Sequence, residues 1–172
     1  MPDPTPATIA NALATIIRGV SDYGREVLIG DLVLPTYEDF DEAGWQDTHE
    51  MAGGRPRHRF WKVYWTGRSD VRGPSTAHRV PLQRVHRTYN FVCECLSSFD
   101  ETVDTQDGFY DMVDRVMNAI DNEVRLGFTE GGTVRTDNLV CQMDSIIQEG
   151  DFDMHHAIIT LDVLVDTGYS PT

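Results

Sequence analysis

The sequence predicts an α+β fold in which two amphipathic helices pack on one face of a mostly antiparallel sheet. Two stretches carry apolar residues at helical spacing, and other stretches alternate apolar and polar residues as half-buried strands do. The last two alternating stretches follow one another as a hairpin, which does not fit the repeated strand-helix-strand units of a parallel sheet. With 172 residues, 40% of them hydrophobic, we expect a single domain over residues 1–172 that buries roughly 70% of the unfolded chain's surface.

The first part of the chain predicts one helix followed by one strand. A helix is expected over Pro6 to Val20, because Thr5 suits the N-cap and Pro6 the first helical position. The stretch from Glu26 to Leu34 is short and aliphatic and is closed by Pro35, which favours a buried strand. The apolar stripe of the helix consists of Ile9, Leu13, Ile16, Ile17 and Val20.

Two long loops are predicted on either side of the next strand. Residues 36–57 show no periodicity and contain several Gly and one Pro, so we expect a long exposed loop. From Phe60 to Thr66 the alternation returns and predicts a strand with aromatic residues on both faces. Residues 67–84 combine Gly, Pro and scattered Arg, which predicts a second long loop or arm.

Three elements complete the prediction. Val85 to Leu96 alternates as a half-buried strand, Asp104 to Leu126 has helical periodicity with Gly127 as its stop, and Leu139 to Asp166 forms a long hairpin turning at residues 148–151. The inward face of the strand is expected to carry Tyr89, Phe91, Cys93 and Cys95. The apolar stripe of the helix is expected to carry Phe109, Met112, Val113, Val116, Met117, Ile120 and Val124.

The charge of the chain is strongly acidic and unevenly spread. It has 14 basic residues against 28 acids, a formal net charge of −14, and Lys62 is its single lysine. This balance argues against general affinity for nucleic acid. An acid-rich, lysine-poor surface is typical of proteins that work in high salt, whereas a basic belt on an acidic body indicates an oriented contact surface. A GC-rich gene and a solvated basic loop would give the same composition. The basic belt consists of Arg55, Arg57, Arg59, Lys62, Arg68, Arg72, Arg79, Arg84 and Arg87, against Asp70 alone.

The sequence gives little support to an enzyme, a cofactor site or a membrane protein. Asp151 to His156 places two carboxylates and two imidazoles together, but adjacent His residues in an extended segment point to opposite faces and cannot share one metal ion. Cys93 and Cys95 share one strand face, where buried apolar roles fit them better than zinc. No phosphate-binding loop, zinc-hydrolase or serine-hydrolase motif occurs. We therefore expect no enzyme activity, no cofactor and no metal, and neither a membrane span nor a secretion signal.

Aromatic residues near the basic belt leave nucleic-acid binding as a third hypothesis. Trp61, Tyr64, Trp65 and Tyr89 alternate within strands like core residues, so core positions are favoured over base stacking. The second hypothesis is a small cone-shaped ligand-binding protein or enzyme of the nuclear-transport-factor-like type, in which separated His and acidic residues could form a dyad.

The size and order of the elements resemble those of the tail terminator (tail completion) proteins of tailed viruses. The resemblance covers the first helix, the Arg-rich strand and arm, the strand that runs into the second helix, and the closing hairpin. It implies a structural virion protein, assembled in the host cytoplasm, that forms a hexameric ring at the head-proximal end of the tail tube. The ring would end tube polymerisation and join the tail to the neck. A neck or head-completion connector would have a similar layout, and the acidic composition would suit a virus of a halophilic host.

The resemblance implies contacts with other copies of the chain, with the tail tube protein, with a neck or head-completion protein, and with lumenal DNA without sequence specificity. A ring needs two different patches on each subunit, and a basic arm with an acidic helix face offers this complementarity. The expected basic contact residues are Arg55, Arg57, Arg59, Arg68, Arg72, Arg79 and Arg84. The expected acidic ones are Asp107, Asp111, Asp114 and Asp121.

Overall fold

The computed structural model describes residues 4–20, 27–29, 46–50, 56–73, 82–98, 106–128, 134–149 and 152–171. Side-chain environments are described over a narrower set, which excludes those of the first two strands and of several strand ends. The statements below concern these parts of the chain.

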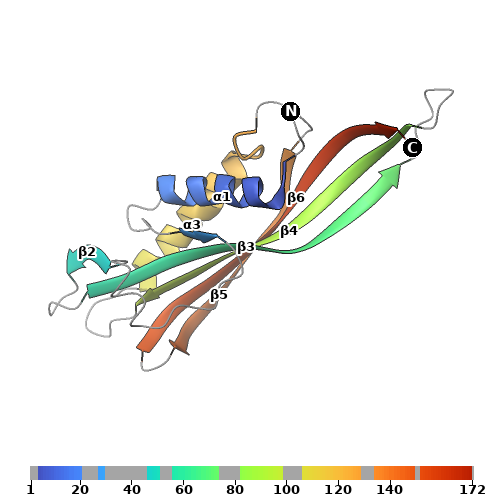
Figure 1. The fold of residues 1–172 in the computed structure, drawn as a ribbon. Coiled ribbons are helices and arrows are strands. Elements are labelled where there is room, and N and C mark those ends of the chain that lie inside the picture. The colour runs from blue at the N-terminus through green and yellow to red at the C-terminus, as the bar shows by residue number, and fades with distance from the viewer. Residues whose placement is uncertain are drawn as a thin grey trace.

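The fold is α+β, as predicted, with a mostly antiparallel sheet (Figure 1). The strand order is β1-β3-β4-β6-β5, in which β1 pairs parallel with β3 and the other neighbours are antiparallel. A further strand, β2, pairs antiparallel with the start of β3. The elements in chain order are α1 (Pro6–Val20), β1 (Val27–Ile29), β2 (Gln46–Glu50), β3 (Pro56–Gly73), β4 (Leu82–Ser98), α3 (Gln106–Asn122), β5 (Val134–Glu149) and β6 (Phe152–Pro171).

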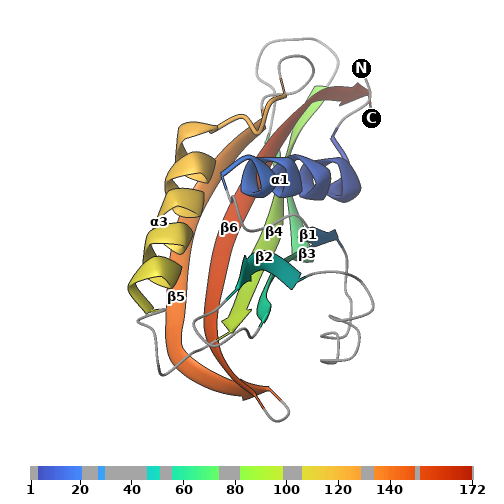
Figure 2. The same ribbon diagram turned by 90° about the vertical axis from the view of Figure 1, so that its left-hand side faces the viewer.

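Both helices lie on the same face of the sheet (Figure 2). The helix α1 has the predicted bounds, and the Thr5 hydroxyl accepts a hydrogen bond from the Thr8 amide at 3.3 Å, as an N-cap does. It contacts α3, β1 and β3, whereas α3 packs against β5 and β6. No described helix is long and apolar enough to cross a membrane.

The main hydrophobic core fills the space between the helices and the sheet. Most predicted inward residues of the three central strands are buried there, including Trp61 and Phe91, together with most of the apolar stripes of both helices. Ile16, Val20 and Met117 are only partly buried, and Trp65 is exposed. On the other face of the sheet, Leu96 and Met154 are also buried, so the sheet has two buried faces at that end. The buried β6 residues of the main core are Ala157, Ile159, Leu161, Val163 and Val165.

The end of α3 corrects one predicted core position. The helix ends at Asn122 rather than near Leu126, and a turn follows in which Leu126 and Gly127 have positive φ angles of 50° and 76°. Because the helical path has ended, Val124 leaves the apolar stripe and is exposed. The Val124 carbonyl accepts a hydrogen bond from the Thr136 amide at 2.9 Å, which fixes the turn to β5.

Both predicted loops are partly wrong, because β3 and β4 are much longer than expected. Within residues 36–57 the structure has β2 and the start of β3, and within residues 67–84 it has the end of β3 and the start of β4; residues 36–45, 51–55 and 74–81 lie outside the described part. The pairing of β3 with β4 continues from Arg68↔Tyr89 to Gly73↔Arg84. Backbone hydrogen bonds between the strands hold these mostly polar stretches extended.

The arm is therefore a sheet extension and not a loop. We define the arm as Arg68–Gly73 of β3, Leu82–Arg87 of β4 and Asp166–Pro171 of β6, which pair with one another and project past the helices (Figure 1).

Candidate assembly surfaces

The sheet carries opposite charges at its two sides. The strand β3 lies on one side and has five basic residues against one acid, Asp70. The strand β5 forms the other side and has three acids, Asp137, Asp144 and Glu149, against Arg135. The neighbouring helix α3 adds four Asp residues against Arg115. The strand β3 is thus net basic in composition, and β5 and α3 are net acidic.

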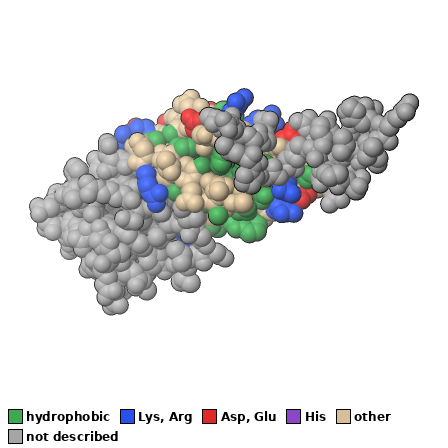
Figure 3. Space-filling model, turned by 45° about the horizontal axis from the view of Figure 1, so that its top comes forward, with side chains coloured by type: hydrophobic (Ala, Val, Ile, Leu, Met, Phe, Trp, Pro, Cys, Tyr) green, Lys and Arg blue, Asp and Glu red, His purple; other side chains and the backbone are tan. Residues whose placement is uncertain are grey.

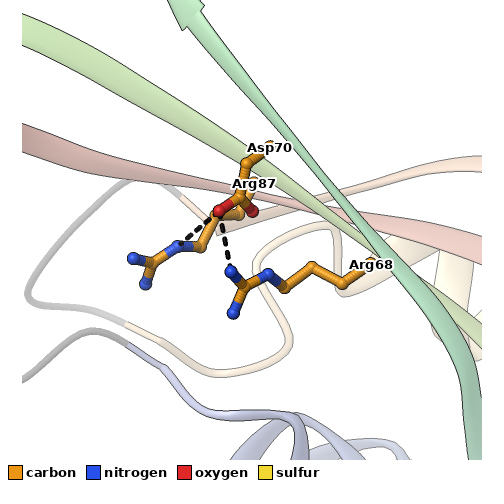
Figure 4. Close-up of polar contacts among 3 residues, drawn as sticks. All are labelled: Arg68, Asp70 and Arg87. Atoms are coloured by element: carbon orange, nitrogen blue, oxygen red, sulfur yellow. Dashed lines mark hydrogen bonds and ion pairs between the residues drawn. The ribbon is translucent and has the colours of Figure 1, made fainter.

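A cluster of two guanidinium groups and one carboxylate marks the base of the arm (Figure 4). Arg68 donates a hydrogen bond to Asp70 Oδ2 at 2.8 Å, and Arg87 Nε lies 3.8 Å from the same oxygen. Asp70 and Arg87 are paired across β3 and β4, so the register brings them together. Such exposed pairs contribute roughly 0–1 kcal/mol to folding. Together, the two guanidinium groups and the carboxylate leave a net positive charge at the base of the arm.

Hydrophobic side chains are exposed near both sides of the sheet. Trp65 and Val71 of β3 are 52% and 62% exposed. On β5, Val140 is 59% exposed, and Met143 and Ile146 are also exposed. Where the arm leaves the body, basic, acidic and hydrophobic side chains lie side by side (Figure 3). Apolar residues at strand edges, among charges, are typical of contact surfaces.

Both outer strands have edges without a described partner strand. On its outer side, β3 pairs with β2 only as far as His58 and with β1 only from Trp61 to Val63. Among the described strands, none pairs with the outer side of Tyr64–Gly73 or with the outer side of β5. These edges present backbone N–H and C=O groups in a row, which can pair with another extended segment.

The predicted contact residues occupy two separate regions. Arg68 is exposed at the base of the arm. Arg57, Arg59, Arg72 and Arg84 lie on β3 or β4 with undescribed side chains, and Arg55 and Arg79 lie outside the described residues. The four predicted acids are exposed on α3: Asp107, Asp111, Asp114 and Asp121.

Among the described side chains, the acids of α3 do not pair with Arg68, because α3 packs against β5 and β6 rather than β3. Asp111 instead pairs with Arg115 at 3.0 Å, and Asp114 accepts a hydrogen bond from Asn118 at 3.0 Å. Both pairs lie on the solvent side of the helix.

Trp65 is a candidate contact residue between copies that the alternation pattern did not indicate. It continues the alternation of Trp61 and Val63, which predicts a core position, and Trp61 and Val63 are indeed fully buried. Trp65 is the cross-strand partner of Phe91 and lies on the helix side of the sheet. The pairing of β1 with β3 ends at Val63, two residues before Trp65. Trp65 therefore sits on an edge strand beyond the cover of the helices.

A buried polar cluster lies on the face of the sheet away from the helices, and no sequence motif indicated it. His156 Nε2 is 3.0 Å from Glu94 Oε1, and Lys62 is the cross-strand partner of Glu94. The Lys62 ammonium lies 4.8 Å from the centroid of the Tyr64 ring, and its side chain is only 7% exposed. The hydrogen bond from His156, opposed by partial burial and assisted by the charges of His156 and Lys62, lowers the pKa of Glu94.

The structure also places the residues considered for a metal site. His155 and His156 point to opposite faces of β6, as predicted: His155 stacks on Phe109 of α3 with ring centroids 5.1 Å apart, and His156 meets Glu94. Cys93 and Cys95 are buried in the core, and burial raises the pKa of Cys93 to about 12. Within the described residues, no three His, Cys, Asp or Glu side chains are grouped to hold a metal ion.

Comparison with solved structures finds a distant structural similarity. No family model matches the sequence, and no curated protein matches it either. A solved structure similar to this chain is the PVC sheath/tube terminator of an extracellular contractile injection system, seen by cryo-electron microscopy in its extended state. The TM-score is 0.39 and the identity 12%, over 99% of this chain and 58% of the other. The present chain thus spans less than two thirds of the length of that terminator chain.

Proposed function

We propose that the chain is a structural tail protein, a tail terminator that assembles head-to-tail into a hexameric ring at the head-proximal end of a viral tail tube. The observation that carries the proposal is the charge polarity of the sheet, whose basic β3 side and acidic β5 side lie at opposite edges. Two different complementary patches on one subunit generate a heterologous contact, and such a contact closes into a ring when the rotation between subunits allows it.

The order of elements supports the choice of a tail terminator among ring-forming proteins. The helix, the Arg-rich strand with its arm, the strand leading to the second helix and the closing hairpin are all present. In this role the ring binds the tail tube protein on one side and a neck protein on the other, and its lumen passes DNA. The predicted contacts between the arm Arg residues and the α3 acids fall between neighbouring copies. The acid-rich surface suits a halophilic host.

The first test is the molar mass of the purified protein by light scattering, in low and in multimolar salt. We expect six times the monomer mass of 19.4 kDa, and closed rings in negative stain. A monomer in every salt concentration would contradict self-assembly.

A second test separates a terminator from other ring proteins. Rings added to polymerising tail tube protein should shorten the tubes and bind their ends. Rings that form but leave tube length unchanged would overturn the terminator role and favour a neck connector.

A further inference from the structure

We infer that the subunits of the assembly join edge to edge, with Tyr64–Gly73 of β3 in one copy pairing with Val140–Asp144 of β5 in the next. The sheet then continues from copy to copy. This inference rests on the proposed self-assembly and adds the surfaces that make it.

The β5 segment is suited to pairing because it is regular. Irregularities in the β5–β6 register fall between Asp137 and Val140 and between Asp144 and Ile147, which leaves Val140–Asp144 as an even stretch between them. Five residues of strand span about 17 Å. The ten residues of Tyr64–Gly73 are long enough to accommodate this segment, with a single irregularity between Trp65 and Gly67.

Both edges carry exposed apolar residues on each face of the sheet. Val71 and Val140 lie on the face away from the helices. Val71 pairs with His86, which pairs with Asp166 of β6, and Val140 pairs with Thr160 of β6. Asp166 and Thr160 alternate with the buried β6 residues of the main core, so they lie on the opposite face. Trp65 and Met143 lie on the helix side, opposite Phe91 and Ala157. Trp65 and Val71 are six residues apart on β3, whereas Val140 and Met143 are three apart on β5, so one register brings one of these apolar pairs directly opposite, and a cross-strand pair of this kind stabilises a sheet.

The charges favour pairing of β3 with β5 over pairing of β3 with β3 or of β5 with β5. The β3 segment carries Arg68 and Arg72 against Asp70, and the β5 segment carries Asp144 alone. Two β3 segments would therefore bring net positive charges together and two β5 segments net negative ones, with the α3 acids beside them. Like charges directly opposite one another destabilise a sheet, whereas β3 against β5 brings opposite charges together. The partner that fits each edge is thus the other edge of a second copy.

Cysteine cross-linking tests this pairing directly. Each variant carries Cys141→Ser, because Cys141 is a partly exposed thiol on the β5 edge. The introduced cysteines are Ser69→Cys or Val71→Cys on β3 and Val140→Cys on β5. The three new thiols lie on the face away from the helices. A bifunctional maleimide tolerates a shift in register, and Cys93 and Cys95 stay buried. Thr15→Cys, exposed on α1, is the matched control.

We expect mixtures of a β3 variant with the β5 variant to give covalent dimers, and a β3–β5 double variant to give a ladder that ends at the ring size. Each single variant alone and all Thr15→Cys mixtures should remain uncross-linked. A single variant that links to itself would show symmetric pairing and overturn the inference, as would mixtures without dimers. Rings of unchanged mass without cross-links would overturn the edge pairing and leave the proposed function intact, whereas the absence of a ring in the wild-type protein contradicts both.

Discussion

The two halves of β3 differ sharply although they belong to one continuous strand. In the first half, Trp61 and Val63 are fully buried beneath the helices and paired on both sides. In the second half, Trp65 and Val71 are exposed and the outer edge has no described partner. The alternation of Trp61 and Val63 continues to Trp65 in the sequence, so the exposure of Trp65 arises from the neighbours of the strand. The first half stabilises the fold, and in the proposed assembly the second half contacts a neighbouring copy.

The largest effect expected from this difference comes from two matched tryptophan substitutions. Trp61→Ala removes a fully buried side chain and should lower the free energy of unfolding by about 3–5 kcal/mol. Trp65→Ala, on the same face of the same strand, removes a half-exposed side chain and should cost about 1 kcal/mol or less. Urea denaturation of both variants measures this, and equal losses would contradict the division of β3 into two halves.

The next largest effect concerns the buried polar cluster in the body. Glu94→Gln should lower the free energy of unfolding near pH 7 by about 1–3 kcal/mol, because it removes the charge beside Lys62 and His156. The folded-state pKa of Glu94 lies below its ordinary value of 4.5. Its stabilising contribution is therefore complete above pH 4.5 and is lost as the pH falls through the lower folded-state pKa.

Urea denaturation between pH 3 and 7 measures this dependence. The stability difference between wild type and Glu94→Gln should shrink at the acid end of the range. Asp153→Asn, at an exposed position on β6, is the control and should show no comparable loss. A difference independent of pH would contradict an ionised Glu94.

A smaller effect on stability is expected from substitution of two glycines, one in the first turn of α3 and one in the turn that follows the helix. Gly127 has a φ of 76°, so Gly127→Ala should cost about 1–2 kcal/mol. Gly108 lies within the helix with nothing within 4 Å of an added Cβ, so Gly108→Ala should raise stability by about 0.5–1 kcal/mol. Thermal melts should shift in opposite directions, and shifts of the same sign would contradict the turn at Gly127.

The smallest effect on stability should come from the basic belt. Replacing Arg68, Arg72 and Arg79 together by Ser should change the free energy of unfolding by less than about 1 kcal/mol, since the Arg68–Asp70 pair is exposed and such pairs contribute little. Assembly should nevertheless weaken. Light scattering reports the mass and urea denaturation the stability. Unchanged ring formation would contradict the role of these residues in contacts between copies.

Short-range patterns predicted the body of the molecule well. The bounds of α1 and the inward faces of β4 and β6 follow from periodicity and capping, which depend on neighbouring residues. The end of α3 was placed too late, because the apolar stripe continues in the sequence to Val124 after the backbone has turned.

The arm and the buried cluster depend on pairing between distant strands and could not be predicted in the same way. Arg68–Gly73 is mostly polar and ends with Gly, so its sequence predicts a loop, although its pairing with β4 makes it a strand. The exposure of Trp65 follows from where β1 stops. Likewise, Glu94 and His156 are 62 residues apart, and only the register of β4 against β6 brings them together.

Hydrogen exchange of backbone amides, in the assembled and in the dissociated protein, tests the division of roles in β3 most directly. The account predicts that outward-pointing amides of Tyr64–Gly73 and Val140–Asp144 become protected on assembly, while the amides of Trp61 to Val63 are protected in both states. Equal exchange of the two edges in both states would contradict the claim that these edges join neighbouring copies.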